Sequence, residues 1–118
     1  MWNNPEPEVV LVVSPQGSLV GVTLGNDVNL RDFEGRSALL LGKAKDNNAS
    51  CALGPFVRLL DDSLSLDDVR GLDISFEIQG NDKFHLKGTS SLNLISRDVT
   101  ELVQHALNEH QYPGNWYQ

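Results

Sequence analysis

The chain has 118 residues and a formal net charge of −7 at pH 7, and 40% of its residues are hydrophobic while 21% are charged. These values predict one soluble domain with a single hydrophobic core, and they exclude a disordered tail and a membrane-spanning protein. The negative charge disfavours nucleic acid as a partner, because affinity for phosphates comes largely from Lys and Arg.

Cys51 is the only cysteine of the sequence, so no intrachain disulfide can form. A lone cysteine favours a reducing compartment, and residues 1–6 lack both the basic and the apolar part of a secretion signal. We therefore expect a cytoplasmic protein that does not bind membranes. Cys51 itself is expected to be a small buried residue near the functional site.

The first elements in chain order are predicted to form a β-hairpin. Residues 8–13 and 19–24 are rich in β-branched side chains, and residues 14–18 between them have the composition of a turn. Gly25-Asn26 then predicts the end of the second strand. Residues 27–36 are polar and punctuated, which indicates a loop with one helical turn.

The central part of the chain has weaker patterns. Residues 38–41 are apolar, and residues 42–50 are polar without a clear period, which indicates a loop. Residues 53–60 predict a strand that is entered through a turn. Residues 66–69 predict a helical turn between two elements.

The last third is predicted to contain a second hairpin and a helix. Residues 72–79 alternate apolar and polar side chains, a Gly-Asn-Asp turn follows, and residues 83–87 alternate back. After the cap candidates 96–98, apolar residues recur at helical spacing until His110, and Pro113-Gly114 prevents continuation. The predicted fold class is mainly β, within α+β, with one amphipathic helix near residues 97–110.

Glu6 and Glu8 are the first residues with a chemical signal. They lie two positions apart at the start of a predicted strand, so their side chains point to the same face. Pro5 and Pro7 fix φ and remove two backbone donors, which indicates an edge or a strand entry. Two adjacent carboxylates repel, so either water screens them on an exposed strand end or a cation lies between them.

Asp27 favours the cation over the exposed strand end. It follows the second strand of the hairpin, and antiparallel pairing returns that end of the strand to Glu6 and Glu8. Three carboxylates without a Cys or His ligand select Mg²⁺, Mn²⁺ or Ca²⁺ over zinc. The sequence therefore predicts a hard-cation site formed by Glu6, Glu8 and Asp27.

These segments together resemble the fumarylacetoacetate hydrolase family. The resemblance rests on Glu6-Pro7-Glu8, on the run from Gly25 to Asp32, on a lysine-bearing loop and on Leu53-Gly54-Pro55, and it covers nearly the whole chain. It implies part of the mixed β-sandwich roll of that family, and it implies that the predicted metal ligands are the family's ligands. Residues 29–37 and 43–51 are most similar to the bacterial 2-keto-3-deoxy-pentonate dehydratases within the family.

The dehydratase resemblance implies a lyase of pentose catabolism. It would remove water from 2-keto-3-deoxy-D-xylonate or D-arabinonate through a metal-stabilised enolate, giving 2,5-dioxopentanoate. The family lysine lies eight residues before the Leu of Leu-Gly-Pro, which here is Lys45. Lys43 follows a glycine, as the family lysine often does, but it would require two extra residues in the loop. As a base, Lys45 needs a pKa lowered by burial or by the metal.

Four further residues are candidates for substrate binding. The guanidinium of Arg31 suits a substrate carboxylate, and the alternative is an ion pair with Asp27 or Asp32. Two asparagines offer neutral hydrogen bonds, although asparagine is also an ordinary turn residue, and two lysines in this loop are otherwise solvated surface residues. The predicted substrate-binding residues are Arg31, Lys43, Asn47 and Asn48.

The resemblance also implies that the chain is an internal fragment of a catalytic domain. The upstream lid region and the downstream strands of the family are missing over residues 1–118, and no residue is a convincing acid for the leaving hydroxyl. A homodimer or larger assembly is implied for the full-length protein. The alternatives are a hydrolase or decarboxylase of the same family, acting on an acylpyruvate or oxaloacetate, and a catalytically silent β module.

Overall fold

The computed structural model describes residues 2–110, and its secondary structure is mixed α+β, with short strands and a few helices, as predicted. The described residues fall into two compact units. The first combines the residues up to Val10 with Thr23–Phe56, and the second combines Leu11–Val22 with the residues from Val57 onward. No helix within residues 2–110 has the length and apolar character needed to cross a membrane.

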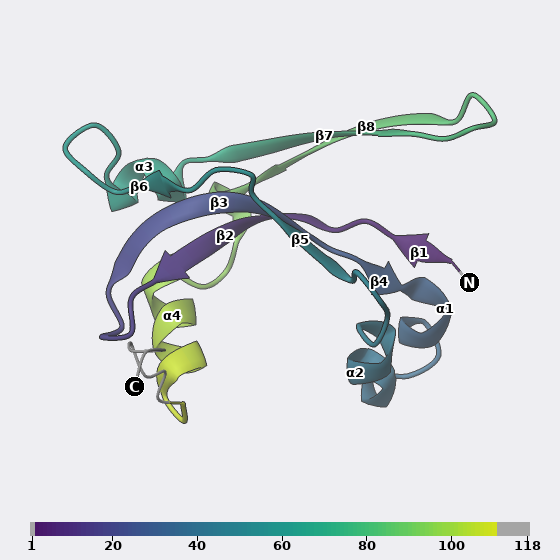
Figure 1. Ribbon diagram of the computed structural model, residues 1–118, viewed down its shortest axis with the longest axis horizontal. Coiled ribbons are helices and arrows are strands. Elements are labelled where there is room, and N and C mark those ends of the chain that lie inside the picture. The colour runs from purple at the N-terminus through teal and green to yellow at the C-terminus, as the bar shows by residue number, and fades with distance from the viewer. Residues whose placement is uncertain (1, 111–118) are drawn as a thin grey trace. The chain divides into compact units, whose positions relative to one another are not determined.

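Strands β2 (Pro7–Val13) and β3 (Leu19–Asp27) form the predicted first hairpin (Figure 1). They are neighbours in a sheet of order β2-β3-β5, and β6 also pairs with β3. In the turn, the Ser14 amide donates to the Ser18 carbonyl at 2.8 Å, and the Gly17 amide donates to the Ser14 carbonyl at 2.9 Å. Gly17 has a φ of 84°, a left-handed conformation that glycine adopts at least cost.

The second strand does not end at Gly25-Asn26 as predicted, but continues to Asp27. Strand β5 (Cys51–Leu53) pairs antiparallel with this extension and brings Cys51 opposite Asp27. A Cβ atom at Gly25 would lie 2.5 Å from Cγ2 of Val10. The glycine that suggested a break therefore permits close packing inside a strand.

The helices of the first unit follow a short strand pair, β1 (Asn3–Asn4) with β4 (Asn29–Leu30). The predicted helical turn is α1 (Arg31–Glu34). A 3₁₀ turn (Ala38–Leu40) and α2 (Leu41–Ala44) come next, so the prediction of a loop from residue 42 is wrong for residues 42–44. The buried side chains of this unit include Ala44, Leu30 and Asn29.

In the second unit, β6 (Arg58–Leu59) pairs with Gly21–Val22 of β3. The single strand predicted over residues 53–60 is instead two short strands with Gly54-Pro55 between them, because proline has no amide to donate to a sheet. Helix α3 (Leu66–Arg70) confirms the predicted helical turn, and it begins with a capping box formed by Ser65 and Asp68.

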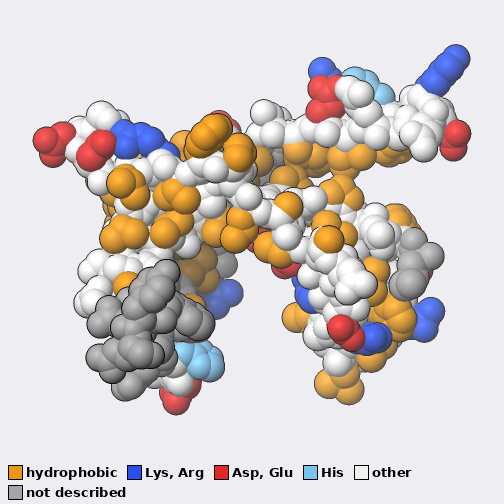
Figure 2. Space-filling view, in the orientation of Figure 1, with side chains coloured by type: hydrophobic (Ala, Val, Ile, Leu, Met, Phe, Trp, Pro, Cys, Tyr) orange, Lys and Arg blue, Asp and Glu red, His pale blue; other side chains and the backbone are white. Residues whose placement is uncertain are grey.

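Strands β7 (Asp73–Gln79) and β8 (His85–Ser91) form the second predicted hairpin, in which β8 extends beyond the expected end. Phe76 lies opposite Gly88, and a Cβ atom at Gly88 would lie 2.2 Å from Cζ of the ring. On the opposite face Glu77 forms an ion pair with Lys87 and a hydrogen bond with His85, both on β8. Figure 2 shows hydrophobic side chains along one side of this ribbon and charged ones along the other.

Helix α4 (Val99–Leu107) is the predicted amphipathic helix, although it is shorter than residues 97–110. It follows a 3₁₀ turn (Leu92–Leu94), and the Asp98 side chain caps it by accepting a hydrogen bond from the Thr100 amide at 2.9 Å. The predicted stop at Pro113-Gly114 lies outside the described residues. The buried side chains of the second unit include Val22, Val69, Ile74, Val99 and Val103.

Candidate metal centre

The three predicted carboxylates lie together in the first unit. Glu6 directly precedes β2, Glu8 lies within it, and Asp27 is the last residue of β3. The Asp27 amide donates to the Glu6 carbonyl at 3.0 Å, which holds the two strand ends together. One carboxylate oxygen from each residue lies within 4.8 Å of the others. The predicted convergence of the three side chains is therefore present in the fold.

The donor set fits a hard divalent cation. All three groups are carboxylates, the ligands that Mg²⁺, Mn²⁺ and Ca²⁺ prefer, and no thiolate or imidazole joins them within residues 2–110. Opposite ligands of one such cation lie about 4–5 Å apart, which is comparable to the limit found for these oxygens. The geometry therefore lets one hard cation contact all three residues.

Lys45, which follows α2, is part of the same cluster. Its Nζ atom lies 2.7 Å from Oε2 of Glu6 and 2.8 Å from Oδ2 of Asp27, and it donates to the Asp27 carbonyl at 3.1 Å. Lys43 is instead exposed and pairs with Asp46 at 2.8 Å. Of the two lysines considered from the sequence, Lys45 is therefore the one that contacts the predicted metal ligands.

Two asparagines that the sequence analysis did not select hold Glu6 in place. The side-chain oxygen of Asn26 accepts a hydrogen bond from the Glu6 amide at 2.9 Å. The Nδ2 group of Asn29 donates to Oε1 of Glu6 at 2.9 Å and to Oε2 of Glu34 at 2.5 Å. Asn29 is fully buried. Its place two residues after Asp27 was the available signal, because such spacing in extended chain puts two side chains on one face.

The electrostatics of the cluster are unequal. Burial raises the pKa of Glu6, but hydrogen bonds from Asn29 and Lys45 outweigh burial, so the net pKa is lowered. Burial and the charge of Asp27 raise the pKa of Glu8. No hydrogen bond or ion pair reaches the Glu8 carboxylate from the described part of the chain. The Lys45 ammonium therefore pairs with two of the three carboxylates, and the negative charge of Glu8 is left without an ion-pair partner among the described residues.

Lys45 does not have the lowered pKa that a base requires. Burial lowers its pKa, but hydrogen bonds to Asp27 and Glu6 outweigh burial, so the net pKa is raised. Burial alone therefore does not give Lys45 the lowered pKa that is expected of a base. The physical reason is that the two carboxylates stabilise the ammonium form.

The predicted substrate-binding residues differ in exposure and in hydrogen-bond partners. Arg31 is exposed, and its Nη1 atom pairs with Oε2 of Glu34, so the alternative considered for it, an ion pair with Asp27 or Asp32, is not the one that forms. Asn48 is exposed, whereas Asn47 is partly buried. The Asn47 side-chain oxygen is buried without a hydrogen-bond partner among residues 2–110.

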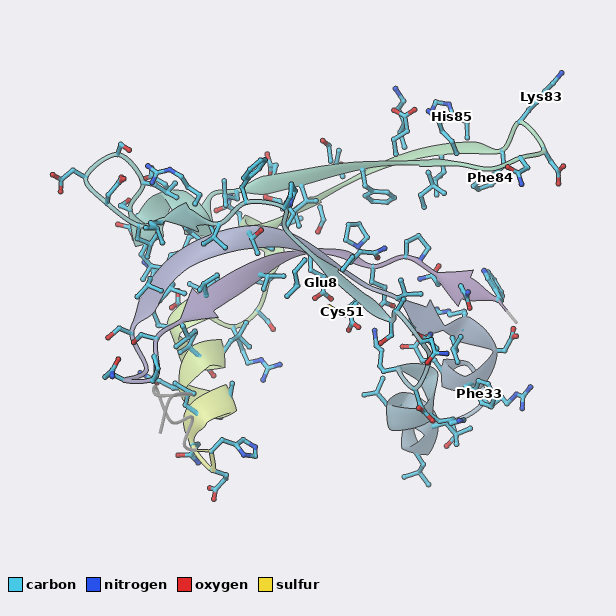
Figure 3. The ribbon with its side chains drawn as sticks, in the orientation of Figure 1. Glu8, Phe33, Cys51, Lys83, Phe84 and His85 are labelled. Atoms are coloured by element: carbon cyan, nitrogen blue, oxygen red, sulfur yellow. The ribbon has the colours of Figure 1, made fainter. Side chains whose placement is uncertain are left out.

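Cys51 lies near the cluster, but it is not buried. Cys51 lies opposite Asp27 in the sheet, which agrees with its expected position near the site. Its side chain, however, is exposed. Figure 3 labels Cys51 on β5 and Glu8 on β2. The expectation of a buried cysteine is wrong because β5 is short and all of its residues are exposed.

No family model matches the chain. The chain is 29% identical over 112 residues to a 2-dehydro-3-deoxy-D-arabinonate dehydratase from Saccharolobus solfataricus. It is 31% identical over 112 residues to a probable 2-keto-3-deoxyxylonate dehydratase from Haloferax volcanii. Each match covers 95% of this chain and 37% of the relative, so the chain spans little more than a third of the length of these relatives.

Solved structures of such dehydratases have the same fold over this stretch. A hexagonal crystal form of 2-keto-3-deoxyarabinonate dehydratase has a TM-score of 0.82 and 29% identity, over 96% of this chain and 39% of that one. A 2-keto-3-deoxy-D-arabinonate dehydratase complexed with magnesium and 2,5-dioxopentanoate has a TM-score of 0.78 and 30% identity, over 90% of this chain and 37% of that one. The resemblance to 2-keto-3-deoxy-pentonate dehydratases is confirmed.

Proposed function

We propose that this chain contributes the cation site and an acid–base residue to a lyase that removes water from a 2-keto-3-deoxy-pentonate and releases 2,5-dioxopentanoate. The observation that carries the proposal is the contact of Lys45 with two of three convergent carboxylates. The similarity to a dehydratase complexed with magnesium and 2,5-dioxopentanoate supports the same reaction.

Glu6, Glu8 and Asp27 are the proposed ligands of Mg²⁺, and Mn²⁺ or Ca²⁺ would fit the same oxygen donors. When bound, the cation would stabilise negative charge that develops on the oxygens of a 2-keto acid. The carboxylates have a second task, because they orient the Lys45 ammonium through Glu6 Oε2 and Asp27 Oδ2. The lysine and a cation therefore share two of the three carboxylates.

Lys45 is the proposed acid–base residue. Dehydration removes a proton from C3 and the hydroxyl from C4, and the hydroxyl leaves as water when it receives a proton. The C3–C4 double bond that forms is then lost as 2,5-dioxopentanoate is made, because C5 gives up one proton, its hydroxyl gives up another, and C3 and C4 each take up one. The Lys45 ammonium, held by Glu6 and Asp27, carries the proton that such a leaving group needs. To accept the C3 proton instead, it would first have to lose its hydrogen bonds to Glu6 and Asp27, which stabilise the charged form.

The proposed substrate-binding residues remain Arg31, Lys43, Asn47 and Asn48. The ion pair with Glu34 limits the orientations of the Arg31 guanidinium. The planar guanidinium suits a planar substrate carboxylate. The unpartnered oxygen of Asn47 is an acceptor for a substrate hydroxyl. Lys43 is exposed, and its ammonium pairs with Asp46.

The reaction is tested with the Mg²⁺-loaded chain and with 2-keto-3-deoxy-D-arabinonate and D-xylonate as separate substrates. NMR should detect 2,5-dioxopentanoate from at least one of them, and Lys45→Ala should abolish its formation while Mg²⁺ still binds. Turnover of an acylpyruvate or oxaloacetate alone would instead favour the hydrolase or decarboxylase. Mg²⁺ binding without turnover of any substrate would favour a catalytically silent module.

The assembly and location of the protein are also proposals. Several large apolar side chains are exposed, including Leu39 at 95% and Phe56 at 84%, which supports association in a homodimer or larger assembly. Light scattering at several concentrations tests this, and a monomer at every concentration would contradict it. The single cysteine supports a cytoplasmic location.

A further inference from the structure

We infer that Asn29 is a positioning residue that fixes the orientation of Glu6 and, through Glu34, ties the proposed cation ligands to Arg31. This inference rests on the proposed cation site, and it concerns a residue outside the predicted ligands and the predicted substrate contacts. It starts from one fully buried amide that donates to two carboxylates from different parts of the chain.

The orientation of the Asn29 amide follows from its partners. Carboxylates only accept hydrogen bonds, so both N–H groups of Nδ2 must face Glu6 and Glu34, at 2.9 and 2.5 Å. The Asn29 side-chain oxygen then points away, and it is buried without a partner among residues 2–110. An unsatisfied buried acceptor costs stability, so an apolar side chain would suit a purely structural position better.

The two carboxylate oxygens of Glu6 have different partners. Oε1 accepts from Asn29, whereas Oε2 pairs with Lys45 and faces the cluster. The carboxylate is therefore held by one oxygen and presents the other. In this orientation Glu6 would contribute a single oxygen to a cation, because its second oxygen is already engaged.

The second N–H group of the Asn29 amide connects to Arg31 through Glu34. Oε2 of Glu34 accepts from Asn29 and also pairs with Arg31. The hydrogen bonds thus run from Lys45 through Glu6, Asn29 and Glu34 to Arg31. Loss of the central amide would release the carboxylates on both sides.

Mn²⁺ binding to the whole chain tests the inference, with calorimetry for affinity and electron paramagnetic resonance for the symmetry of the bound ion. Asn29→Leu keeps the size of the side chain and removes the donor, and Asn29→Ser is a smaller polar variant that folds more readily if the leucine does not. We expect the Mn²⁺ dissociation constant to rise about 10–100-fold in both, the range found when a residue that orients a ligand is lost. The spectrum should also change, because the freed Glu6 carboxylate can turn.

Val69→Ala is the matched control. Val69 is the other large side chain that is fully buried within the described residues, and it lies in α3 of the second unit. It should lower thermal stability while leaving the dissociation constant within about twofold of wild type and the spectrum unchanged. Equal weakening of Mn²⁺ binding in Val69→Ala would reduce the effect of Asn29 to general destabilisation and overturn the inference.

Two further outcomes separate the inference from the proposed function. If the wild-type chain binds no Mn²⁺, the proposed cation site fails. If the wild-type chain binds Mn²⁺ and both Asn29 variants bind it with unchanged affinity and spectrum, the cation site stands and the positioning role of Asn29 is overturned.

Discussion

Two charged networks of this protein differ in how well their carboxylates are matched by donors. In the second unit, Arg70 contacts Asp98 through Nε at 2.6 Å and Nη2 at 3.1 Å, and Asp67 through Nη1 at 2.6 Å. Asp98 also accepts from Thr100. In the cluster of the first unit, Lys45 pairs with two of three carboxylates, and the third, Glu8, has no hydrogen bond from the described residues.

The pKa shifts express this difference. The hydrogen bonds from Arg70 and Thr100 hold the pKa of Asp98 well below its usual range. Burial and a neighbouring carboxylate move the pKa of Glu8 in the opposite direction. The Arg70 network therefore stabilises the folded chain. In the cluster, repulsion between carboxylates opposes folding, and a bound cation would remove that repulsion. This contrast supports the proposal of a cation site in the first unit.

The largest expected effect comes from Glu8→Gln, which should change binding and stability in opposite directions. Mn²⁺ affinity should fall more than about 100-fold, because a ligand charge is lost at the site itself. The metal-free variant should melt at a higher temperature than wild type at pH 7, because the repulsion that raises the pKa of Glu8 is gone. Calorimetric titration and thermal unfolding measure the two changes.

Asp98→Asn is the counterpart in the Arg70 network. It should lower the melting temperature and leave Mn²⁺ affinity within about twofold, because Asp98 lies outside the cluster. If both substitutions shifted stability in the same direction, the contrast between the two networks would be wrong.

The next largest effect should come from Lys45→Met, which sharpens the contrast from the cationic side. Its ammonium competes for Glu6 Oε2 and Asp27 Oδ2, so its removal should raise Mn²⁺ affinity about tenfold. Without Mn²⁺ the variant should be less stable than wild type, because three carboxylates are then unpaired. Lys43→Met, which removes an equal charge paired with Asp46, should change the affinity less than twofold.

The pH dependence of stability should separate the networks by sign. The pKa of Asp98 is lowered, so its contribution is present above the ordinary value of 3.8 and is lost as the pH falls through the folded value. The pKa of Glu8 is raised, so its contribution is present below the ordinary value of 4.5 and is lost as the pH rises through the folded value. Urea unfolding of the metal-free chain and both variants between pH 2 and 7 measures this. The stability gap of Asp98→Asn should close toward low pH, and so should the gap of opposite sign for Glu8→Gln.

The smallest effect on the cluster should come from a change in the second hairpin. In Gly88→Val the new side chain meets the Phe76 ring, since even its Cβ atom would lie 2.2 Å from Cζ. We expect a loss of about 1–3 kcal/mol in the free energy of unfolding, as for other overpacked sites. Mn²⁺ affinity should stay unchanged, and a second substitution, Phe76→Ala, should recover part of the stability. Weakened Mn²⁺ binding in Gly88→Val would contradict the separation of the two regions.

The sequence predicted those features that depend on local pattern. The first hairpin follows from two β-branched runs around a turn, and the second follows from alternation and its turn residues. Helix α4 follows from its spacing and its Asp98 cap. The convergence of the three carboxylates follows from the hairpin itself, since Asp27 is at the end of the strand that returns toward Glu6. The choice of Lys45 over Lys43 required the spacing of a family motif, because the two positions have similar local chemistry.

The features that were missed depend on contacts between distant segments. Gly25 looks like a strand break until Val10 of β2 is seen to fill the space above it. Residues 42–44 have no helical period, and the burial of Ala44 is a tertiary effect. Asn29 looks like an ordinary loop residue, and only the fold shows that its amide joins Glu6 to Glu34. The hydrogen bonds of Lys45 to Glu6 and Asp27, which raise its pKa, do not follow from the sequence pattern, because these partners are distant in sequence.

The cation site can be tested by a Mn²⁺ titration of the chain beside the triple variant Glu6→Gln, Glu8→Gln, Asp27→Asn, which keeps the size of each side chain. The wild-type chain should bind one ion saturably, Mg²⁺ should displace it, and the folded triple variant should bind none. Equal saturable binding by the triple variant, or no saturable binding by the wild-type chain, would show that these three carboxylates do not form a cation site.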